Sequence, residues 1–365
     1  MWTEQADGLV VPATPGALAA FVDAVCQQLG AEAEVAAEVA GHLVGANLAG
    51  HDSHGVLRLA QYVAERDRGE LVPSARPSVS RRHGACLLLD GHQGFGHYAA
   101  RLACDLAAQV ALEQGIAAVA IRHAGHIGRL GHYCELLANT GLVSLLVMGA
   151  VGPDVGVMAP PGTSRRFLAA NPWALGVPAA DEPVIVDVSM AMLAEGKVSD
   201  AATRGARLPE GCVLDAVRRP SQEPADYFAG GCLLPLGSPV AAHKGFGLAL
   251  GAALLGGLAV IGDDRPTLAG TQRPPWSAGI GEMAGVCLVA IDPEAFGGRD
   301  DYRVAITTVI DSLTHPGDDA TVTVPGTPES HSRRERAESL MLPAAVVNGL
   351  NDIGTRFGVP LQLAT

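Results

Sequence analysis

Five side chains suited to acid–base or anion-binding chemistry fall within eight positions: His51, Asp52, Ser53, His54 and Arg58. An apolar run follows, and Asp52 or Ser53 is a suitable N-cap for a helix that continues to about residue 69. On such a helix His54 and Arg58 are four positions apart and share a face. A carboxylate bound by Arg58 near the helix N-terminus would lie beside the imidazole of His54. This arrangement predicts proton transfer on a small carboxylic acid.

A second turn rich in glycine and histidine, RHAGHIGRLGHY, spans residues 122–133 and follows a predicted strand. Ligands of α/β proteins bind at the C-terminal ends of strands, so His126 is a second acid–base candidate. Nine of the twelve histidines lie between His42 and His132. No adjacent cysteine or carboxylate set completes a metal site, so we predict no metal. A histidine- or metal-dependent hydrolase stands as an alternative.

The elements that must position these residues form an α/β pattern with helices at both ends. Helices are predicted at about 15–28, 31–47, 194–198, 245–261 and 343–356. Three more are predicted from 52 or 53 to about 69, from the segment 91–100 to about 114, and after 133 to about 139. Strands are predicted at 85–90, 115–122, 142–148, 183–188, 286–291 and 305–310. The apolar segment 245–261 is rich in glycine and alanine, and we expect a buried helix because a membrane span needs about 20 strongly apolar residues.

Composition narrows the class of protein. The chain has 365 residues, is 48% hydrophobic and carries a net charge of −13, so a nucleic acid partner is not expected. Its start shows no signal-peptide pattern, and we expect no membrane association. The seven cysteines are scattered without a CxxC pair, which favours reduced, mostly buried thiols and a cytoplasmic location.

The segment DSHGVLRLAQY at 52–62 resembles the N-terminal signature of the malate/L-lactate dehydrogenase family, whose members lack a Rossmann fold. Further segments resemble that family in the same order: GHIGRLGHY at 125–133, the loop at 159–178, LPEG at 208–211, AAHKGFGLAL at 241–250 and VPGTPE at 324–329. The loop departs from the family pattern at Gly162-Thr163 and at Ala169-Ala170. A non-catalytic relative is therefore a further alternative.

This resemblance implies an α/β fold with a non-Rossmann mixed-sheet NAD(P)-binding core, a helical N-terminal region and a C-terminal helix. The expected division is 1–84, 85–325 and 326–365, with the last segment packing on the first. The implied activity is hydride transfer between NAD or NADP and a small 2-oxo or 2-hydroxy acid. The alternative is reduction of a cyclic imino acid of the piperideine- or pyrroline-2-carboxylate type. A small carboxylate substrate and a homodimer are also implied.

The predicted site residues fall into two groups. The catalytic candidates are His54, Ser53, Arg58 and His126, with His54 as the expected proton donor and His126 as its rival. The resemblance implies that the cofactor lies on Asp187, Val188, Ser189, Met190, His243, Lys244, Gly326, Thr327 and Pro328. Lys244 opens a predicted helix beside glycine, which suits a phosphate. Gly94, Gly96 and Ala99 form a GxGxxA match, but the next strand ends without the acidic residue of a Rossmann fingerprint.

Overall fold

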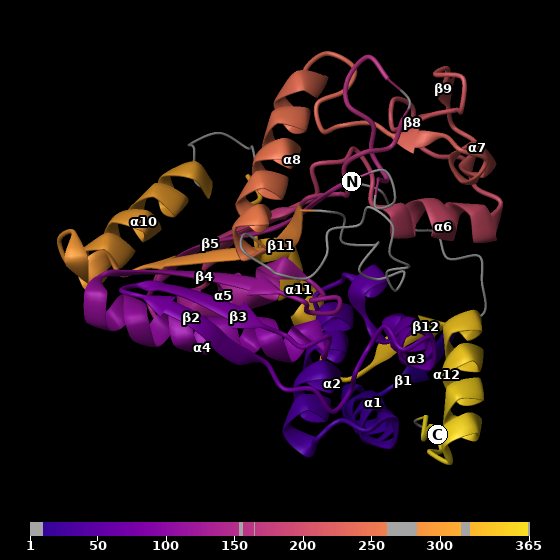
Figure 1. Cartoon of the computed structure of the whole chain (residues 1–365), viewed down its shortest axis with the longest axis horizontal. Helices are drawn as coiled ribbons and strands as arrows, with labels where there is room; N and C mark the ends of the chain where they lie inside the picture. Colours follow the sequence, from indigo (N-terminus) through magenta and orange to yellow (C-terminus); the bar gives the residue numbers. More distant parts are fainter. Residues whose placement is uncertain (1–9, 153–155, 164, 261–282, 315–321, 364–365) are drawn as a thin grey trace.

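A seven-stranded mixed sheet forms the centre of the molecule (Figure 1). This computed structural model describes residues 10–152, 156–163, 165–260, 283–314 and 322–363. The strand order is β2 (Ser78–His83), β3 (Cys86–Asp90), β4 (Ile116–Arg122), β11 (Met283–Ile291), β5 (Val143–Val151), β6 (Trp173–Val177) and β7 (Val184–Val188). Only β3 and β4 pair in parallel, and the other neighbours in this sheet are antiparallel. The predicted mixed sheet is confirmed.

Helices cover both faces of this sheet. α4 (Gly96–Gln114) and α5 (Leu130–Asn139) pack on one face, and α8 (Ala242–Gly256) packs along β5 and β11 on the other. Along β11, Val286 and Leu288 belong to the core under α4 and α5, whereas Cys287 joins the core under α8. This alternation follows the period of two expected of a strand that is covered on both faces.

The helix α8 approaches the sheet closely at one point. A Cβ on Gly149 of β5 would lie 2.1 Å from the carbonyl oxygen of Ala252, so glycine is required there. Together with the 3-10 turn η3 (Gly257–Ala259), α8 is apolar and long enough to cross a membrane, yet it packs along the sheet. Its outer face exposes Leu248 and Leu254. The prediction of a buried helix is thus correct for one face only.

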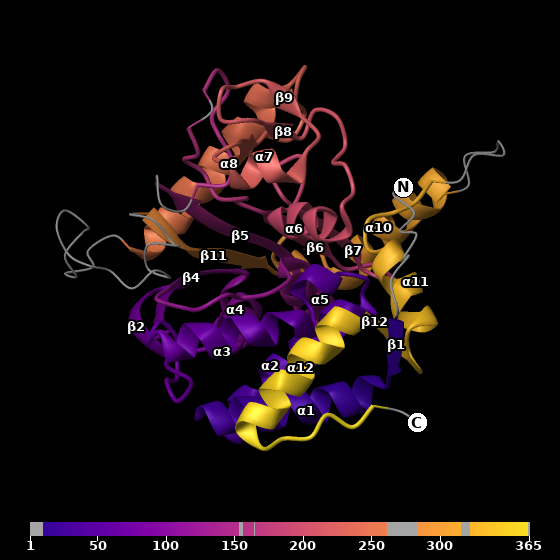
Figure 2. The same ribbon diagram turned by 90° about the vertical axis from the view of Figure 1, so that its right-hand side faces the viewer.

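The N-terminal helices form a second core with the end of the chain. They are α1 (Pro15–Leu29), α2 (Ala33–Leu48) and α3 (Leu59–Asp67). α12 (Ala344–Phe357) packs on α1 and α3, and β1 (Val10–Ala13) pairs with β12 (Leu340–Pro343). Figures 1 and 2 show α12 beside α1. Thr14 caps α1 by accepting the N–H of Ala17 at 3.2 Å, and Gly30 ends the helix with φ 109°. Both ends were predicted from Thr14-Pro15 and Gly30.

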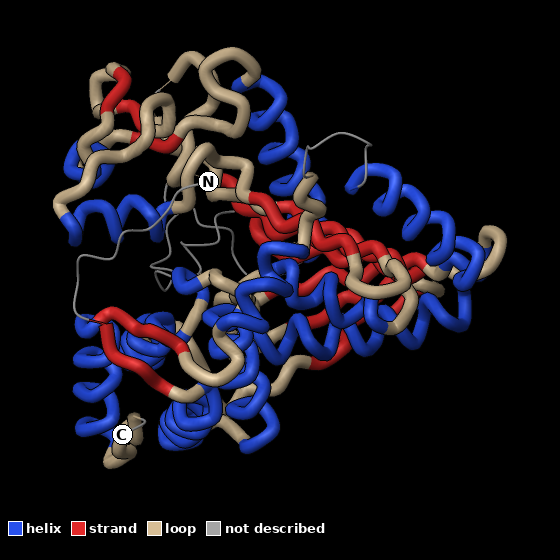
Figure 3. Tube along the Cα trace, turned by 180° about the vertical axis from the view of Figure 1, so that it is seen from behind, coloured by secondary structure: helices blue, strands red, loops and turns tan. Residues whose placement is uncertain are grey.

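A third, smaller core lies beside the end of β7. It contains α6 (Glu195–Arg204), α7 (Pro224–Phe228) and a small sheet of β8 (Val213–Leu214), β9 (Pro220–Ser221) and β10 (Cys232–Leu233). Figure 3 shows this small sheet, the β1–β12 pair and the central sheet as separate groups of strands. The third core buries Met190 against Val198, Tyr227 and Ala249, so it connects the end of β7 with α8.

Two predicted elements are wrong. The expected strand at 305–310 is part of α10 (Arg299–Thr314), which follows the 3-10 turn η4 (Pro293–Ala295). Its β-branched residues favour a strand, but Tyr302, Ile306 and Ile310 are partly buried at helical spacing. The expected helix start at Asp52 is also wrong, because two 3-10 turns, η1 (Asp52–His54) and η2 (Val56–Arg58), precede α3.

The prediction of free, mostly buried cysteine thiols is confirmed. All seven are free thiols, and Cys86 alone among them is exposed. Burial raises the pKa of Cys26 and of Cys134 to about 12, which keeps these thiols protonated and unreactive.

Candidate active site

The turn at 52–55 is held by one buried amide. Asn47, near the end of α2, is 1% exposed. Its Nδ2 donates to Asp52 Oδ1 at 2.6 Å, and its Oδ1 accepts the backbone N–H of Val56 at 2.8 Å. A Cβ on Gly55 would lie 2.2 Å from Asn47 Oδ1, so glycine is required there. Asp52 and Gly55 therefore shape the turn that carries Ser53 and His54.

Two residues from the C-terminal part of the chain bind the turn at 52–55. They are Glu329 of α11 (Thr327–Glu335) and Arg336, which follows this helix. Arg336 donates through one guanidinium nitrogen to the carbonyl of Asn47 at 2.7 Å and to Asp52 Oδ1 at 3.1 Å. His51 Nε2 lies 2.9 Å from Glu329 Oε1. Because His51 and Glu329 are 278 positions apart, this support depends on the complete fold.

Ser53, His54 and Arg58 lie together and are partly exposed. Ser53 Oγ is 3.0 Å from His54 Nδ1, and Arg58 Nε donates to the Ser53 carbonyl at 2.6 Å. A second guanidinium nitrogen of Arg58 donates to Gln61 Oε1 at 2.8 Å. The third faces the start of α6, where a Cβ on Gly196 would lie 4.0 Å from it. Among the described residues that third nitrogen makes no hydrogen bond, so it has the capacity to bind a carboxylate.

His126 comes from the glycine-rich turn between β4 and α5, and a second glycine-rich turn supports it. The N–H of Gly125 donates to the Gly94 carbonyl at 3.0 Å. A Cβ on Gly96 would lie 2.1 Å from the carbonyl oxygen of Gly125. The GxGxxA glycines therefore pack backbone against backbone with the turn that carries His126.

The imidazoles of His54 and His126 stack, with ring centroids 5.7 Å apart and 24° between their planes. Burial, followed by the positive charge of Arg58, lowers the pKa of His54 to about 4. The same two causes, in the same order, hold the pKa of His126 well below its usual range. Both rings are therefore neutral at neutral pH, and each has one N–H and one lone pair with which to exchange a proton.

Two buried residues behind His126 were not predicted from the sequence. The hydroxyl of Tyr62 lies 2.9 Å from His126 Nδ1 and 3.2 Å from His97 Nε2. Tyr62 is 1% exposed and His97 is fully buried. The spacing of four between Arg58 and Tyr62 was a usable signal for Tyr62, whereas the contact with His97 crosses from α3 to α4 and has no local signal.

Asp187, at the end of β7, is fixed against α5. Its Oδ2 accepts the N–H of Gly131 at 2.7 Å, and burial raises the pKa of this carboxyl. A Cβ on Gly131 would lie 3.1 Å from Asp187 Oδ2 and 2.9 Å from a guanidinium nitrogen of Arg129. That Arg129 nitrogen is buried and has no hydrogen-bond partner among the described residues. A buried donor with spare capacity thus lies close to the carboxylate.

The turn before α11 lies against β7. The N–H of Ile185 donates to the Pro325 carbonyl at 3.0 Å. Gly326 has φ 101°, and a Cβ there would lie 3.1 Å from the carbonyl oxygen of Pro183. The structure therefore places the turn at 325–326 against residues 183–185 of β7, next to the strand end that carries Asp187. A carboxylate and a close backbone turn suit the ribose of a dinucleotide. The N–H groups at the start of α11 are already used, because that of Thr327 donates to the Val324 carbonyl at 3.1 Å and that of Glu329 to its own carboxylate.

The other predicted residues of these segments differ in exposure. Val188 is 39% exposed and Met190 is buried at 1%. Ser189 Oγ accepts the N–H of Ala191 at 3.1 Å, so this hydroxyl shapes the chain after β7. Thr327 and Pro328 are exposed in the first turn of α11.

His243 and Lys244 are exposed in the first turn of α8. A Cβ on the next residue, Gly245, would lie 2.2 Å from the carbonyl oxygen of Leu236, whose N–H donates to the Met190 carbonyl at 2.8 Å. The start of α8 is thereby connected to the chain after β7. Figures 1 and 2, however, both show α8 apart from α11.

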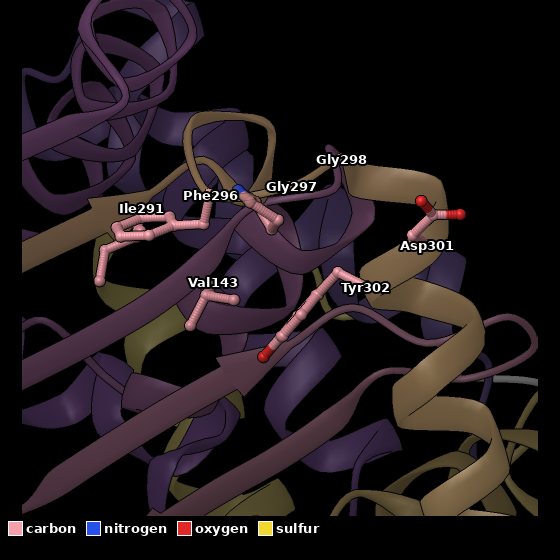
Figure 4. Close-up of a pocket in the computed structure, with 8 residues that line it drawn as sticks. Val143, Ile291, Phe296, Gly297, Gly298, Asp301 and Tyr302 are labelled. Atoms are coloured by element: carbon pink, nitrogen blue, oxygen red, sulfur yellow. The ribbon is translucent and has the colours of Figure 1, made fainter.

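No group of three or more His, Cys, Asp or Glu side chains has the geometry of a metal site within the part of the chain that the structure describes. A cavity of about 440 Å³ lies between the sheet and α10, lined by Val143, Ile291, Phe296 and Tyr302 among others (Figure 4). Its lining has no histidine, lysine or arginine. The acid–base residues therefore lie elsewhere, around His54 and His126.

Comparisons with known proteins show the family of this chain. The model of the malate/L-lactate dehydrogenase family matches residues 14–351. Hydroxycarboxylate dehydrogenase B of Escherichia coli is 34% identical over 350 residues, which cover 94% of this chain and 93% of that protein. The solved sulfolactate dehydrogenase of Methanocaldococcus jannaschii superposes with a TM-score of 0.82 at 27% identity and covers 97% of this chain and 98% of its own.

A third similar protein is named as a reductase and not as a hydroxy-acid dehydrogenase. The solved Δ1-piperideine-2-carboxylate reductase of Pseudomonas syringae has a TM-score of 0.78 at 27% identity, covering 94% of this chain and 99% of its own. The near-complete family match and the 34% identity extend over all the segments that build the site. This chain is an oxidoreductase that belongs to the malate/L-lactate dehydrogenase family.

Proposed function

We propose that this protein transfers a hydride between NAD or NADP and a small 2-oxo or 2-hydroxy acid. The observation that carries the proposal is the partly exposed group of Ser53, His54, Arg58 and His126. In this group one cation lies beside two stacked, neutral imidazoles. Reduction of a 2-oxo acid needs a cation for the carboxylate and a proton for the carbonyl oxygen. These residues supply both.

In this proposal Arg58 binds the carboxylate through the guanidinium nitrogen that faces α6. His126 gives the proton, because Tyr62 holds its Nδ1 at 2.9 Å and so directs its Nε2 to the substrate. His54 was expected at the N-terminus of an α-helix, and two 3-10 turns stand there instead. We assign His54 a hydrogen bond to the substrate oxygen, with Ser53 Oγ fixing its tautomer at 3.0 Å.

A nicotinamide cofactor bound beside β7 supplies or accepts the hydride. We assign Asp187 to a ribose hydroxyl, and the turn at 326–328 to close backbone contact with the dinucleotide. Val188, Ser189 and Met190 form the adjoining chain. Lys244, with His243, is the proposed phosphate contact, because an exposed ammonium in the first turn of a helix favours an anion.

A second candidate function is reduction of a cyclic imino acid. The similarity to a piperideine-2-carboxylate reductase over 94% of this chain favours it. The same residues serve this reaction, since Arg58 would bind the carboxylate and His126 would protonate the imine nitrogen. The two functions differ only in the acceptor atom, so substrate choice decides between them.

The test is a substrate panel with both reduced cofactors. Pyruvate, oxaloacetate, sulfopyruvate, piperideine-2-carboxylate and pyrroline-2-carboxylate are each mixed with the enzyme and NADH or NADPH, and loss of reduced nicotinamide absorbance is followed. We expect oxidation with one class of acceptor, and a marked loss of that rate in Arg58→Lys. Absence of oxidation with every acceptor and both cofactors would overturn the proposal.

We also propose that the protein is a cytoplasmic homodimer, as the family resemblance implies. Among the described residues, α10 has no fully buried side chain, and it exposes Val304 at 64% and Val309 at 55%. A second copy that covers this face would remove apolar surface from water. Light scattering should give twice the monomer mass for the wild type and a lower mass for Val304→Glu. A monomeric wild type would contradict the proposal.

A further inference from the structure

Buried side chains continue inward from His126. Tyr62 bridges His126 Nδ1 and His97 Nε2 through one hydroxyl, at 2.9 and 3.2 Å. Both bridged rings have lowered pKa values, chiefly because of burial, and the pKa of His97 is about 3. Each ring is therefore neutral and carries one N–H and one lone pair. Three groups that each donate and accept one proton form an unbroken hydrogen-bonded path.

One hydroxyl proton allows this path two arrangements. In the first, Tyr62 donates to His126 Nδ1 and accepts the N–H of His97, so that Nε2 of His126 carries a proton toward the substrate. In the second, Tyr62 donates to His97 and accepts from His126, so that Nε2 of His126 is a bare acceptor. The two arrangements differ by one proton shifted along the three groups. When His126 gives its Nε2 proton to the substrate, the path changes from the first arrangement to the second.

The inner end of the path has a nitrogen without a partner. His97 Nδ1 is fully buried and accepts or donates no hydrogen bond among the described residues. A buried polar atom left in this way costs about 1–3 kcal/mol, so it calls for an explanation. The next ring, His42, has its centroid 4.7 Å from that of His97. Its Nδ1 is also buried without a partner in the described part of the chain.

The tautomer of His42 is determined by its surroundings. Its Nε2 accepts the backbone N–H of Arg129 at 2.9 Å, and burial holds its pKa well below the usual range. The neutral ring therefore carries its proton on Nδ1. The ring of His132 follows, 4.6 Å from that of His42, and its Nε2 is 3.9 Å from Glu38 Oε1. The side chains of His132 and Glu38 are 26% and 18% exposed, so the column of rings reaches the surface.

We propose that Tyr62 and His97 form a proton relay that keeps His126 neutral when it gives up its Nε2 proton during turnover; this inference rests on the proposed function. His126 gives its Nε2 proton to the substrate oxygen or nitrogen and takes the Tyr62 hydroxyl proton at Nδ1. Tyr62 takes the Nε2 proton of His97, and His97 takes at Nδ1 one proton that water delivers from the solvent, because His42 Nε2 already accepts the Arg129 N–H and cannot pass a proton on. After the product leaves, the bare Nε2 of His126 takes a proton from the solvent, and the path returns to its first arrangement. One proton is thus consumed for each hydride transferred. The route matters because a bound substrate covers the other nitrogen of His126.

Tyr62→Phe tests the relay, because it removes the bridging hydroxyl and keeps the ring. Tyr133→Phe is the matched control. Tyr133 is equally buried and its ring packs on His42 and His132, but its hydroxyl donates to the Ile127 carbonyl at 2.6 Å and to neither histidine. Single-turnover reduction of the best acceptor is measured in water and in deuterium oxide. Cofactor affinity and thermal unfolding are measured in parallel for both variants.

We expect Tyr62→Phe to slow single-turnover reduction about 10- to 100-fold, toward the lower end of acid–base losses, because His126 itself remains. Its solvent deuterium isotope effect should exceed that of the wild type, with cofactor affinity unchanged. Tyr133→Phe should lower the unfolding temperature without either kinetic change. His97→Gln, at the other end of the bridge, should repeat the kinetic result and serves if Tyr62→Phe does not fold.

The contrary outcomes are distinct. The relay alone is overturned if the wild type is active but Tyr62→Phe and His97→Gln show no specific loss. In that case both rates lie within about twofold of the Tyr133→Phe rate, and the isotope effect is unchanged. A wild type that reduces no member of the panel overturns the proposed function and the relay together. Loss of cofactor affinity in Tyr62→Phe that accounts for the slower rate also overturns the relay, because it shows a structural role.

Discussion

The histidines at 54 and 126 differ from those at 42 and 97 in their access to solvent. Burial lowers the pKa of all four, so charge does not separate them. His54 and His126 are partly exposed beside Arg58, whereas His42 and His97 are 2% and 0% exposed. Only the first pair can touch a substrate. The second pair can act only through neighbouring side chains. The role of each histidine therefore follows from its exposure and its hydrogen-bond partners and not from its residue type.

Two helix starts repeat this contrast. Both Gly96 of α4 and Gly245 of α8 stand in glycine-rich sequences that suit a phosphate on sequence grounds. Gly96 packs on the backbone of Gly125, because a Cβ on Gly96 would lie 2.1 Å from the Gly125 carbonyl oxygen. Gly96 therefore supports the turn that carries His126. The start of α8 leaves Lys244 exposed. The start of α4 therefore has a structural role, whereas the start of α8 exposes a cation that can bind an anion.

The largest expected effect comes from the exposed histidines. His126→Gln should lower kcat about 10²–10⁴-fold, the usual loss when an acid–base group is removed. His54→Gln should lower kcat less, because a hydrogen bond is lost and the proton source stays. Steady-state kinetics with the best acceptor measure both variants. A larger loss in His54→Gln would return the donor role to His54, and near-normal turnover in both would remove these rings from the chemistry.

Arg58→Lys tests the cation beside the two exposed rings. A lysine keeps the charge but cannot reproduce the guanidinium geometry or the bond to the Ser53 carbonyl at 2.6 Å. We expect kcat/KM for acids to fall about 10- to 100-fold, equivalent to one charge-assisted contact, with unchanged cofactor affinity. If fluorescence titration shows weaker cofactor binding instead, Arg58 belongs to the dinucleotide site.

The contrast between helix starts predicts opposite results for two variants. Lys244→Ala should weaken NAD(P)H binding about tenfold, as expected for loss of one charged contact. Gly96→Ala should leave cofactor affinity unchanged and lower the free energy of unfolding by about 1–3 kcal/mol, because the new Cβ meets the Gly125 carbonyl. Fluorescence titration and denaturant unfolding measure the pair. The reverse pattern would place the cofactor at the N-terminal glycines.

The smallest effect concerns pH and stability. The pKa of His97 falls from 6.5 to about 3 on folding, and that of His132 falls to about 4. The unfolded chain therefore binds more protons below pH 6.5, so stability present above that pH is lost as the pH falls toward these values. The unfolding temperature should drop between pH 7 and pH 5, and less steeply in His97→Gln. Equal slopes would show that His97 is not buried as a neutral ring.

The fold was predictable where local signals act alone. Thr14-Pro15 and Gly30 predicted the ends of α1, and short apolar runs of strand length predicted β3, β4 and β5. The segment 305–310 failed because a β-branched composition outweighed its helical spacing in the sequence argument. The start at Asp52 failed because Asn47 and Arg336 hold that turn, and Arg336 is 284 positions from Asp52.

The same limit applies to the site. Ser53, His54 and Arg58 are close in sequence, so one motif identified them together, and the structure adds His126 to the group through the ring stack. The bond between Tyr62 and His97 spans 35 positions and two helices. No periodicity or motif spacing predicts a contact of this kind, because it depends on how α3 and α4 pack.

The most direct test of hydride transfer uses a reduced cofactor labelled with deuterium at the transferable position of its nicotinamide ring. The enzyme is mixed with this cofactor and the best acceptor, and the product is examined by mass spectrometry and proton NMR. Our account predicts one deuterium on the carbon next to the carboxylate and almost none in the product formed by His126→Gln in the same time. A product without deuterium at that carbon, or an acceptor cleaved by water, would contradict it.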